Sequence, residues 1–214
     1  MNRLIAVSLL LVSLASSAKA QWTLGQWNLG ANGHFYSVQA ITGPNDGWLI
    51  ARSQAQVLTA PNGVSVDLAT ITSASENTFV FNGINSPTYW ILDPANNNEG
   101  PNLGGFQFDN LNEPSGDWSW VTGEAWSYTN WSVGSPNNQA GTEDYLTYFN
   151  LGGNFRSDSW NDISSATSPA GTGIHYYVAE TTSVAASAPE PGTLVLIAFG
   201  IAGLIPSRRM GKNL

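Results

Sequence analysis

The 214-residue sequence contains no cysteine. Loops in this chain therefore cannot be tied by disulfides, and zinc–thiolate sites, iron–sulfur clusters and thiol nucleophiles are excluded. The chain instead carries nine tryptophans, and each large aromatic side chain buries roughly 150–250 Å2. We therefore expect core packing alone to hold the fold. The tryptophans expected in the core are Trp90, Trp118, Trp120, Trp131 and Trp160.

Charged residues are few and mostly acidic. They make up 10% of the chain, against about 25% in an average soluble domain. Residues 21–188 hold 14 Asp and Glu but only two basic residues, Arg52 and Arg156, which gives a formal net charge of −12. Such a body repels phosphate backbones and anionic lipids. This excess of negative charge argues against nucleic-acid binding and favours cations or neutral polar molecules as ligands.

The first 20 residues have the pattern of a secretory signal peptide. Arg3 precedes an apolar run from Leu4 to Leu14, and Ala18-Lys19-Ala20 follows. A basic start, a short apolar stretch and small residues two apart are typical of a cleaved signal. The apolar run is too short for a membrane anchor of roughly 20 residues. We expect cleavage after Ala20 and export of the protein.

The C-terminal region predicts a second targeting segment. Small and polar residues over 181–188 indicate a linker. Residues 189–214 then contain a Pro-Glu-Pro-Gly motif, an apolar run from Thr193 to Ile205, and Arg208-Arg209. This order resembles the PEP-CTERM sorting signal of Gram-negative bacteria. The resemblance implies transient anchoring in the inner membrane by this segment, with the arginines in the cytoplasm. It also implies recognition by an exosortase-type transpeptidase, removal of the tail, and delivery to the cell surface, outer envelope or extracellular matrix. A plain C-terminal helix is the alternative.

Residues 21–180 predict one α+β domain. The spacing of Trp48, Ala51, Ala55 and Leu58 indicates a helix over 48–58 that Asp46 would cap. A second helix is predicted from Ser73, with Glu76 completing a capping box. Because most strands follow the two early helices instead of alternating with them, we expect an antiparallel sheet. The predicted strands are His34–Ala40, Tyr89–Leu92, Trp118–Val121, Tyr145–Phe149 and Tyr176–Ala179.

A series of motifs over residues 33–180 resembles the C-type lectin-like domain. The motifs, in order, are Phe35-Tyr36, the helix from Trp48, Leu68-Ala69-Thr70-Ile71 before the helix from Ser73, Tyr89-Trp90-Ile91, Trp118 to Gly123, Tyr128-Thr129-Asn130-Trp131, Gly134 to Asn138, Glu143-Asp144-Tyr145-Leu146, Trp160-Asn161-Asp162 and Tyr177 to Glu180. The resemblance implies two helices flanking an antiparallel sheet, with a long-loop region and here without disulfides.

The resemblance also implies a calcium ion that bridges the protein to two neighbouring sugar hydroxyls. The matching positions are Ser135, Asn137, Glu143, Asn161 and Asp162. In the family the first of these positions is a glutamate, so Ser135 departs from the pattern and leaves the sugar specificity open. The family uses the following proline in the cis form, which predicts a cis bond between Ser135 and Pro136.

The chemistry of the four matching ligands suits calcium, which takes six to eight oxygen ligands. Asn137 and Asn161 can supply amide oxygens, and Glu143 and Asp162 can supply carboxylates, with the Asp162 carbonyl as a further donor. Because Ser135 removes a negative charge, we expect weak binding, which extracellular sites at about 10⁻⁴–10⁻³ M tolerate. Asn and Asp also structure turns, so loop-forming hydrogen bonds are the alternative role.

An accessory calcium at Asn138 and Asp144 is less expected, because the family usually has an acid at the first of these positions. Many members of this fold bind neither calcium nor sugar.

The sequence does not predict an enzyme. His34 and His175 are the available histidines, and no nucleophile motif accompanies them. Acidic pairs such as Glu143-Asp144, or Glu113 with Asp117, could resemble a glycosidase pair, but acid-rich loops provide such pairs by chance.

Two hypotheses for function remain. The leading one is an exported, calcium-dependent module that binds a glycan or exopolysaccharide. The alternative is a structural or adhesive scaffold that uses the lectin fold for protein contacts.

The targeting patterns give the first testable prediction. We expect the mature protein to begin at or near Gln21 and to lack the segment Thr193–Leu214. Intact-mass spectrometry on protein from the native cell envelope measures both ends. A mature chain that still ends at Leu214 would contradict the sorting-signal hypothesis.

Overall fold

The computed structural model describes residues 21–181 except 110, 154, 167 and 170. The predicted signal peptide, nearly all of the predicted linker and the predicted sorting segment lie outside these residues. Within the described range, no helix has both the length and the apolar character to cross a membrane.

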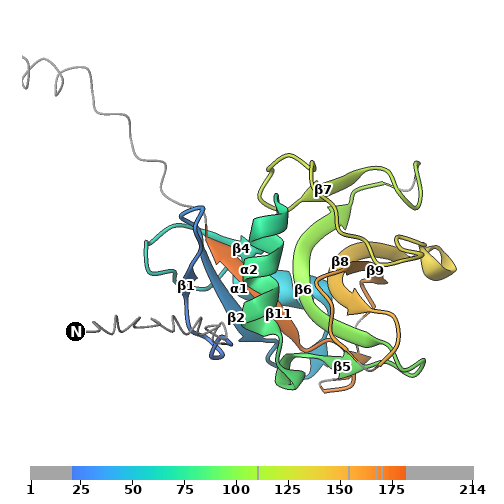
Figure 1. Ribbon diagram of the computed structural model, residues 1–214, viewed down its shortest axis with the longest axis horizontal. Helices are drawn as coiled ribbons and strands as arrows, with labels where there is room; N and C mark the ends of the chain where they lie inside the picture. Colours follow the sequence, from blue (N-terminus) through green and yellow to red (C-terminus); the bar gives the residue numbers. More distant parts are fainter. Residues whose placement is uncertain (1–20, 110, 154, 167, 170, 182–214) are drawn as a thin grey trace, which may run out of the picture.

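The described strands form a nine-stranded sheet around β2, β11, β6, β8 and β9 (Figure 1). Along the main path the order is β1-β2-β11-β6-β8-β9, while β4 pairs with β11 and both β5 and β7 pair with β6. Strand β11 runs parallel to β6, and the other pairings are antiparallel. The strands are β1 (Asn28–Leu29), β2 (Phe35–Ala40), β4 (Val66–Leu68), β5 (Ile91–Leu92), β6 (Asn98–Gln107), β7 (Trp118–Trp120), β8 (Glu143–Asn150), β9 (Trp160–Ser164) and β11 (Tyr176–Thr181). A separate pair joins β3 (Asn45–Asp46) to β10 (Ser168–Pro169).

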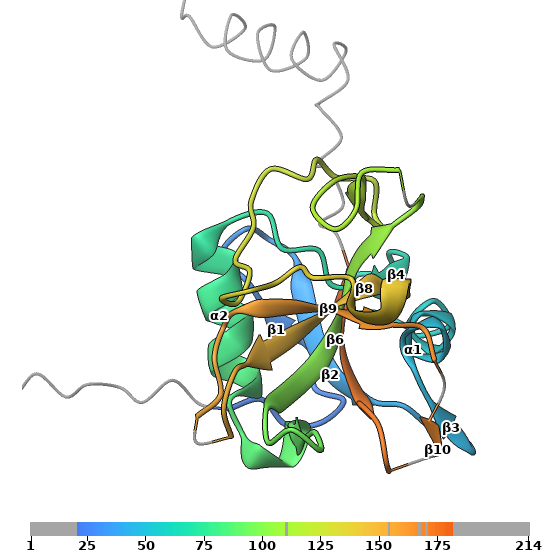
Figure 2. The same cartoon turned by 90° about the vertical axis from the view of Figure 1, so that its right-hand side faces the viewer.

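The two helices cover opposite sides of the central strands (Figure 2). Helix α2 (Ala74–Ile84) contributes Val80 and Ile84 to the larger apolar cluster. Helix α1 (Trp48–Ala55) contributes its buried face to a second cluster with Leu68 and Tyr177. The arrangement confirms the predicted architecture of two helices with a mostly antiparallel sheet.

The predicted helix starts were partly correct. The Ser73 side chain accepts a hydrogen bond from the Glu76 N–H at 3.2 Å, which confirms that cap. The Glu76 carboxylate, however, accepts from Thr72 and not from Ser73. The prediction that Asp46 caps the first helix was wrong, because Asp46 lies in β3 and its buried carboxylate accepts from the Gly171 N–H at 2.8 Å.

Most predicted strand boundaries differ from the structure by one or two residues, and two boundary differences, one in a helix and one in a strand, have a local cause. Helix α1 ends at Ala55 instead of Leu58, since the Leu58 N–H bonds the Ala55 carbonyl in a tighter turn. The predicted strand from Tyr89 begins only at Ile91, because Pro87–Tyr89 forms a short 3₁₀ turn, η1.

The sequence analysis missed the central strand β6 because it is rich in glycine and contains proline. Its sequence, NEGPNLGGFQ, contradicts ordinary strand propensity. The glycines are explained by close packing. A Cβ at Gly104 would lie 2.7 Å from the Leu68 carbonyl oxygen, and one at Gly100 would lie 2.8 Å from the Tyr148 Cβ.

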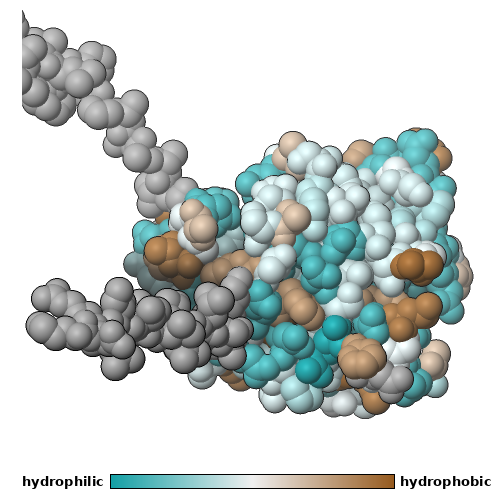
Figure 3. Space-filling model, viewed as in Figure 1, coloured by the Kyte–Doolittle hydropathy of each residue, from teal (hydrophilic) through white to brown (hydrophobic). Residues whose placement is uncertain are grey.

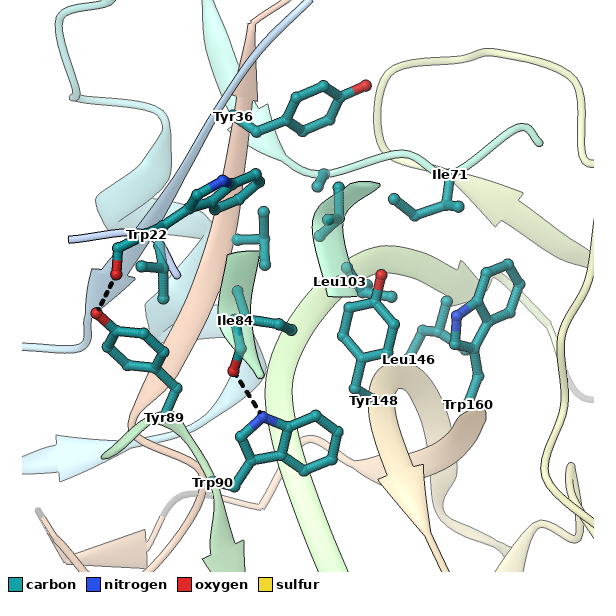
Figure 4. Packing of buried hydrophobic residues seen from close by; sticks show 14 of the residues in the cluster. Trp22, Tyr36, Ile71, Ile84, Tyr89, Trp90, Leu103, Leu146, Tyr148 and Trp160 are labelled. Carbon is teal, nitrogen blue, oxygen red and sulfur yellow. Dashed lines mark hydrogen bonds between the residues drawn. The ribbon is translucent and has the colours of Figure 1, made fainter. Parts of the chain in front are cut away.

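Trp160 is the centre of the aromatic core, part of which is shown in Figure 4. Its side chain is fully buried and meets the rings of Tyr128 and Trp131 edge to face, at centroid distances of 5.4 and 6.1 Å. The indole Nε1 donates to Asn77 Oδ1 at 3.1 Å, and the Tyr148 hydroxyl donates to the same oxygen at 2.9 Å. One amide of α2 therefore links strands β8 and β9.

The tryptophans predicted to be core residues are in the core. Trp90, Trp118, Trp120 and Trp160 are buried, and Trp131 is half-buried against the same cluster.

A network of buried carboxylates joins β2, α2 and β11. His34 Nδ1 lies 2.5 Å from Glu180 Oε1, and the other oxygen of Glu180 accepts from the Thr70 N–H at 2.6 Å. Glu76 accepts from the hydroxyl of Tyr36. The hydrogen bond to Glu180 raises the pKa of His34, and burial raises the pKa of Glu180. Both groups therefore hold protons more tightly in the folded state.

Truncation of Trp160 should destabilise the fold far more than truncation of its neighbour. Trp160→Ala removes a fully buried ring and should cost about 3–5 kcal/mol of unfolding free energy. Asn161→Ala, in the half-buried next residue, should cost about 1 kcal/mol or less. Urea unfolding of both variants without calcium measures the difference. Equal losses would contradict the central position of Trp160.

The carboxylate network predicts that stability falls as pH rises. The folded-state pKa of His34 lies above its ordinary value of 6.5, and that of Glu180 lies above 4.5. Their contributions are present at low pH and are lost as pH passes the folded-state pKa values. Urea unfolding in calcium-free buffer should give higher stability at pH 6 than at pH 8. His34→Gln should reduce this difference. Greater stability at pH 8 in the wild type would contradict the assignment.

Candidate functional site

The candidate site is formed where the loop after β7 packs against β9. The Trp160 N–H donates to the Asn130 carbonyl, and the Ser132 N–H donates to the Trp160 carbonyl. These bonds, together with ring packing on Trp131, fix the loop over the strand. Residues after Ser132 therefore lie beside Asn161 and Asp162.

Four of the five predicted site residues line one hollow of about 250 Å3. They are Ser135, Asn137, Glu143 and Asn161. Asn137 is exposed, and its side chain makes no hydrogen bond to a described residue. The Glu143 carboxylate accepts from the Gln139 N–H at 2.7 Å, at the start of a short turn, η2 (Gln139–Gly141). The loop thus presents amide and carboxylate oxygens to a common space.

Asp162, the fifth residue, lies behind the loop and is fully buried. Its Oδ2 accepts from the N–H groups of Asn137 and Asn138, at 2.8 and 2.6 Å. Its Oδ1 is also buried but has no hydrogen-bond partner among the described residues. The Asp162 carbonyl accepts from Asn161 Nδ2 at 2.6 Å. Oδ2 of Asp162 therefore holds the loop backbone in place, and Oδ1 has no donor in the described chain to balance its negative charge.

Ser135 contacts a predicted ligand directly. Its hydroxyl donates to Asn161 Oδ1 at 2.5 Å. The Ser135–Pro136 bond is cis, as predicted. Because a glutamate could not donate in this way, the serine partly satisfies Asn161 in the absence of an ion.

Two acidic residues outside the hollow, Glu113 and the accessory-ligand candidate Asp144, carry buried carboxylate oxygens. Both carboxylate oxygens of Glu113 and the Oδ1 of Asp144 are buried without a hydrogen-bond partner in the described chain. Burial and the nearby carboxylate of Asp144 raise the pKa of Glu113, with a further contribution from Asp162. Burial also raises the pKa of Glu143, and Asp162 adds to that shift. The charges of these four acids therefore interact, although no three of their carboxylates meet within 4.8 Å of one another in the described chain.

Sequence reasoning did not select Glu113 as a ligand. The only local signal is its position before Pro114, at a second cis bond. Asn138, weighed with Asp144 as an accessory ligand, instead accepts from the Glu143 N–H at 3.1 Å.

The described residues provide no basic side chain to neutralise these four acids. Arg52 pairs with Asp67 at 3.3 Å, and Arg156 donates to Asn85 at 2.7 Å. A buried carboxylate without a partner is costly. Calcium is a hard cation that prefers carboxylate and amide oxygens, so the residues present fit this ion.

A second group of possible metal ligands is explained without an ion. Among the described residues, the ligand atoms of His34, Glu76 and Glu180 lie within 4.8 Å of one another. Both oxygens of each glutamate already accept hydrogen bonds, as the carboxylate network shows. This group is a structural link between elements.

On the face drawn in Figure 3, apolar side chains form small separate groups among polar ones. That face therefore offers no broad apolar area for a protein partner.

Neither the protein-family models nor the curated proteins include a match to this chain. Among solved structures, the chain is similar to the C-type lectin CEL-I from Cucumaria echinata, at 24% identity and a TM-score of 0.50. The match covers 75% of this chain and 97% of that lectin. The EPNH mutant of CEL-I gives 23% identity and a TM-score of 0.50, over 76% of this chain and 99% of the other. These likenesses, with the two helices and the sheet, show a C-type lectin-like fold.

Proposed function

We propose that this domain binds carbohydrate through a calcium ion held at the long loop. The observation that carries the proposal is the fully buried carboxylate of Asp162, whose Oδ1 has no partner in the described chain. The four other candidate donors line the adjoining hollow, and none of them brings a positive charge. A cation with several oxygen ligands is the simplest compensation.

Asn137, Glu143, Asn161 and Asp162 would hold the ion. The two carboxylates balance its charge, and Glu113 and Asp144 add negative potential nearby. The bound ion would supply open coordination positions for sugar hydroxyls. Ser135 would bind weakly or serve only to orient Asn161.

The rim of the hollow suits a sugar ring as well as an ion. Val133 and Leu151 line it and are 90% and 64% exposed. Sugars present hydroxyls on their edges and C–H groups on their faces. The polar floor and the apolar rim of the hollow therefore match the two kinds of surface on a sugar ring.

We further propose that the protein is exported and acts at the cell surface or in the extracellular matrix. The support is the order of sequence patterns at the two ends, including the segment proposed for an exosortase-type enzyme. An extracellular location supplies calcium at concentrations that a weak site can use.

A structural scaffold is the second candidate function. The hydrogen bond between Ser135 and Asn161 favours it, because this bond stabilises the loop without an ion. The two functions differ in whether calcium changes the stability of the fold.

Calcium should stabilise the full-length chain in thermal and urea unfolding. At 100 times the dissociation constant the gain should be about 2.7 kcal/mol. Asp162→Asn should abolish most of this gain without lowering calcium-free stability, since it removes an uncompensated buried charge. Ser135→Glu should strengthen calcium binding because it adds a carboxylate to the hollow.

Asp158→Asn is the matched control. It neutralises an acid in the same segment that lies outside the hollow, so its calcium response should equal that of the wild type. Absence of a calcium shift at millimolar concentration, both in the wild type and in Ser135→Glu, would overturn the calcium proposal and leave the scaffold function.

A further inference from the structure

A second hollow of about 180 Å3 adjoins the candidate sugar site. Glu99 and Glu143 line both hollows. The second hollow also reaches Asn102 of β6 and, beside the start of α1, Asp46 and Trp48. We call it the acidic hollow.

Strand register sets the distance between the two hollows. Asn102 lies opposite Thr147 on β8, and Thr147 lies opposite Asn161 on β9. Two strand spacings separate Asn102 from Asn161, which is roughly 10 Å. Sugar units of one short chain can span this distance. A ligand that starts at the calcium site can therefore extend into the acidic hollow.

At the floor of this hollow, the side-chain oxygen of Asn102 has no hydrogen-bond donor within the described chain to accept from. Its side chain is fully buried, and its Nδ2 is directed to the Tyr176 carbonyl at 3.4 Å. Its Oδ1 has no partner among the described residues. The Trp48 Nε1 cannot serve, because it donates to the Leu103 carbonyl at 2.6 Å. A buried acceptor of this kind requires a donor, which a ligand in the hollow can supply.

The carboxylate of Glu99 in this hollow is also uncompensated. Glu99 makes no hydrogen bond or ion pair with a described residue, and burial, helped by Asp93 and Glu143, raises its pKa to about 7. Asp46 is 2% exposed, but its carboxylate accepts from the Gly171 N–H at 2.8 Å and lies 3.7 Å from His175 Nδ1. No arginine of the described chain lines the hollow. The unpartnered groups in this hollow are therefore hydrogen-bond acceptors and negative charge.

A single metal ion would not satisfy this arrangement. The carboxylate oxygens of Asp46, Glu99 and Glu143 do not come within 4.8 Å of one another as a group, unlike those of the His34 network. The ligand has to offer donors at separate points. An ammonium group has three donors and no acceptor, and a sugar unit adds hydroxyl donors around it.

We propose that the acidic hollow is a subsite for a sugar unit that carries a free amino group. The ammonium group would pair with Glu99, and the Asn102 Oδ1 would accept a hydrogen bond from the same sugar unit. The preferred ligand is then a glycan with unacetylated amino sugars. This inference rests on the proposed carbohydrate-binding function and names its substrate class.

Calorimetric titration of the full-length chain tests the subsite. The probes are a β-1,4-linked glucosamine trimer and cellotriose, which has hydroxyls where glucosamine has amines. In calcium-containing buffer the amino trimer should bind at least about tenfold more tightly, as a charge-assisted hydrogen bond predicts. The preference should weaken with added salt. Glu99→Gln should reduce the ratio of the two affinities to near one.

Glu124→Gln is the matched control, since Glu124 lies outside both hollows, and it should keep the wild-type ratio. Equal affinity for the two trimers in the wild type, an unchanged ratio in Glu99→Gln, or no binding of the amino trimer would each overturn the subsite. Calcium-induced stabilisation of the same samples reports on the proposed function separately. A thermal melt of Glu99→Gln like that of the wild type shows that the variant is folded.

Discussion

Trp160 packs into the core at the point where strand β9 meets the loop of the candidate site. Its ring is surrounded by other aromatic side chains, its Nε1 bonds to Asn77 on α2, and its backbone bonds to Asn130 and Ser132. In a chain without cysteine, these contacts do the positioning that disulfides do elsewhere. The next two residues are Asn161 and Asp162. Core packing therefore fixes the positions of two proposed ligands.

Repulsion among the acidic side chains at the loop opposes the core packing that holds the loop in place. Asp162 is held in a buried position by two backbone N–H groups, although one of its oxygens has no partner in the described chain. Glu113, Glu143 and Asp144 add like charge around it. The arginines among the described residues are engaged elsewhere. The same imbalance recurs in the acidic hollow at Glu99. An external cation at the loop, and a donor-rich ligand beside it, would relieve both.

Local chemistry made part of the fold predictable from sequence. The Ser73 cap, the buried face of α1 and the tryptophan core depend on neighbouring residues or on side-chain size, so they could be read from the chain. Strand β6 could not, because its glycines are required by the close approach of distant parts of the chain, the Leu68 backbone at Gly104 and the Tyr148 side chain at Gly100. Asp46 resembled a helix cap, but it pairs with a segment more than 120 residues later.

The candidate site was predictable to a similar extent. The resemblance to the C-type lectin-like domain predicted Ser135, Asn137, Glu143 and Asn161 as neighbours, and the structure brings them to one hollow. Glu113 and Glu99 come from segments whose position depends on the tertiary fold, and no local pattern distinguishes them from other acids. The hydrogen bond from Ser135 to Asn161 likewise appears only when the loop is placed on β9.

A crystal structure of the protein grown with millimolar calcium tests the central claim most directly. If calcium compensates the buried acids, the crystal structure should contain an ion about 2.3–2.6 Å from oxygens of the proposed ligands, with the Asp162 carboxylate among them. A calcium-free site, with Asp162 Oδ1 bonded only to water or to a protonated neighbouring carboxyl group, would contradict it.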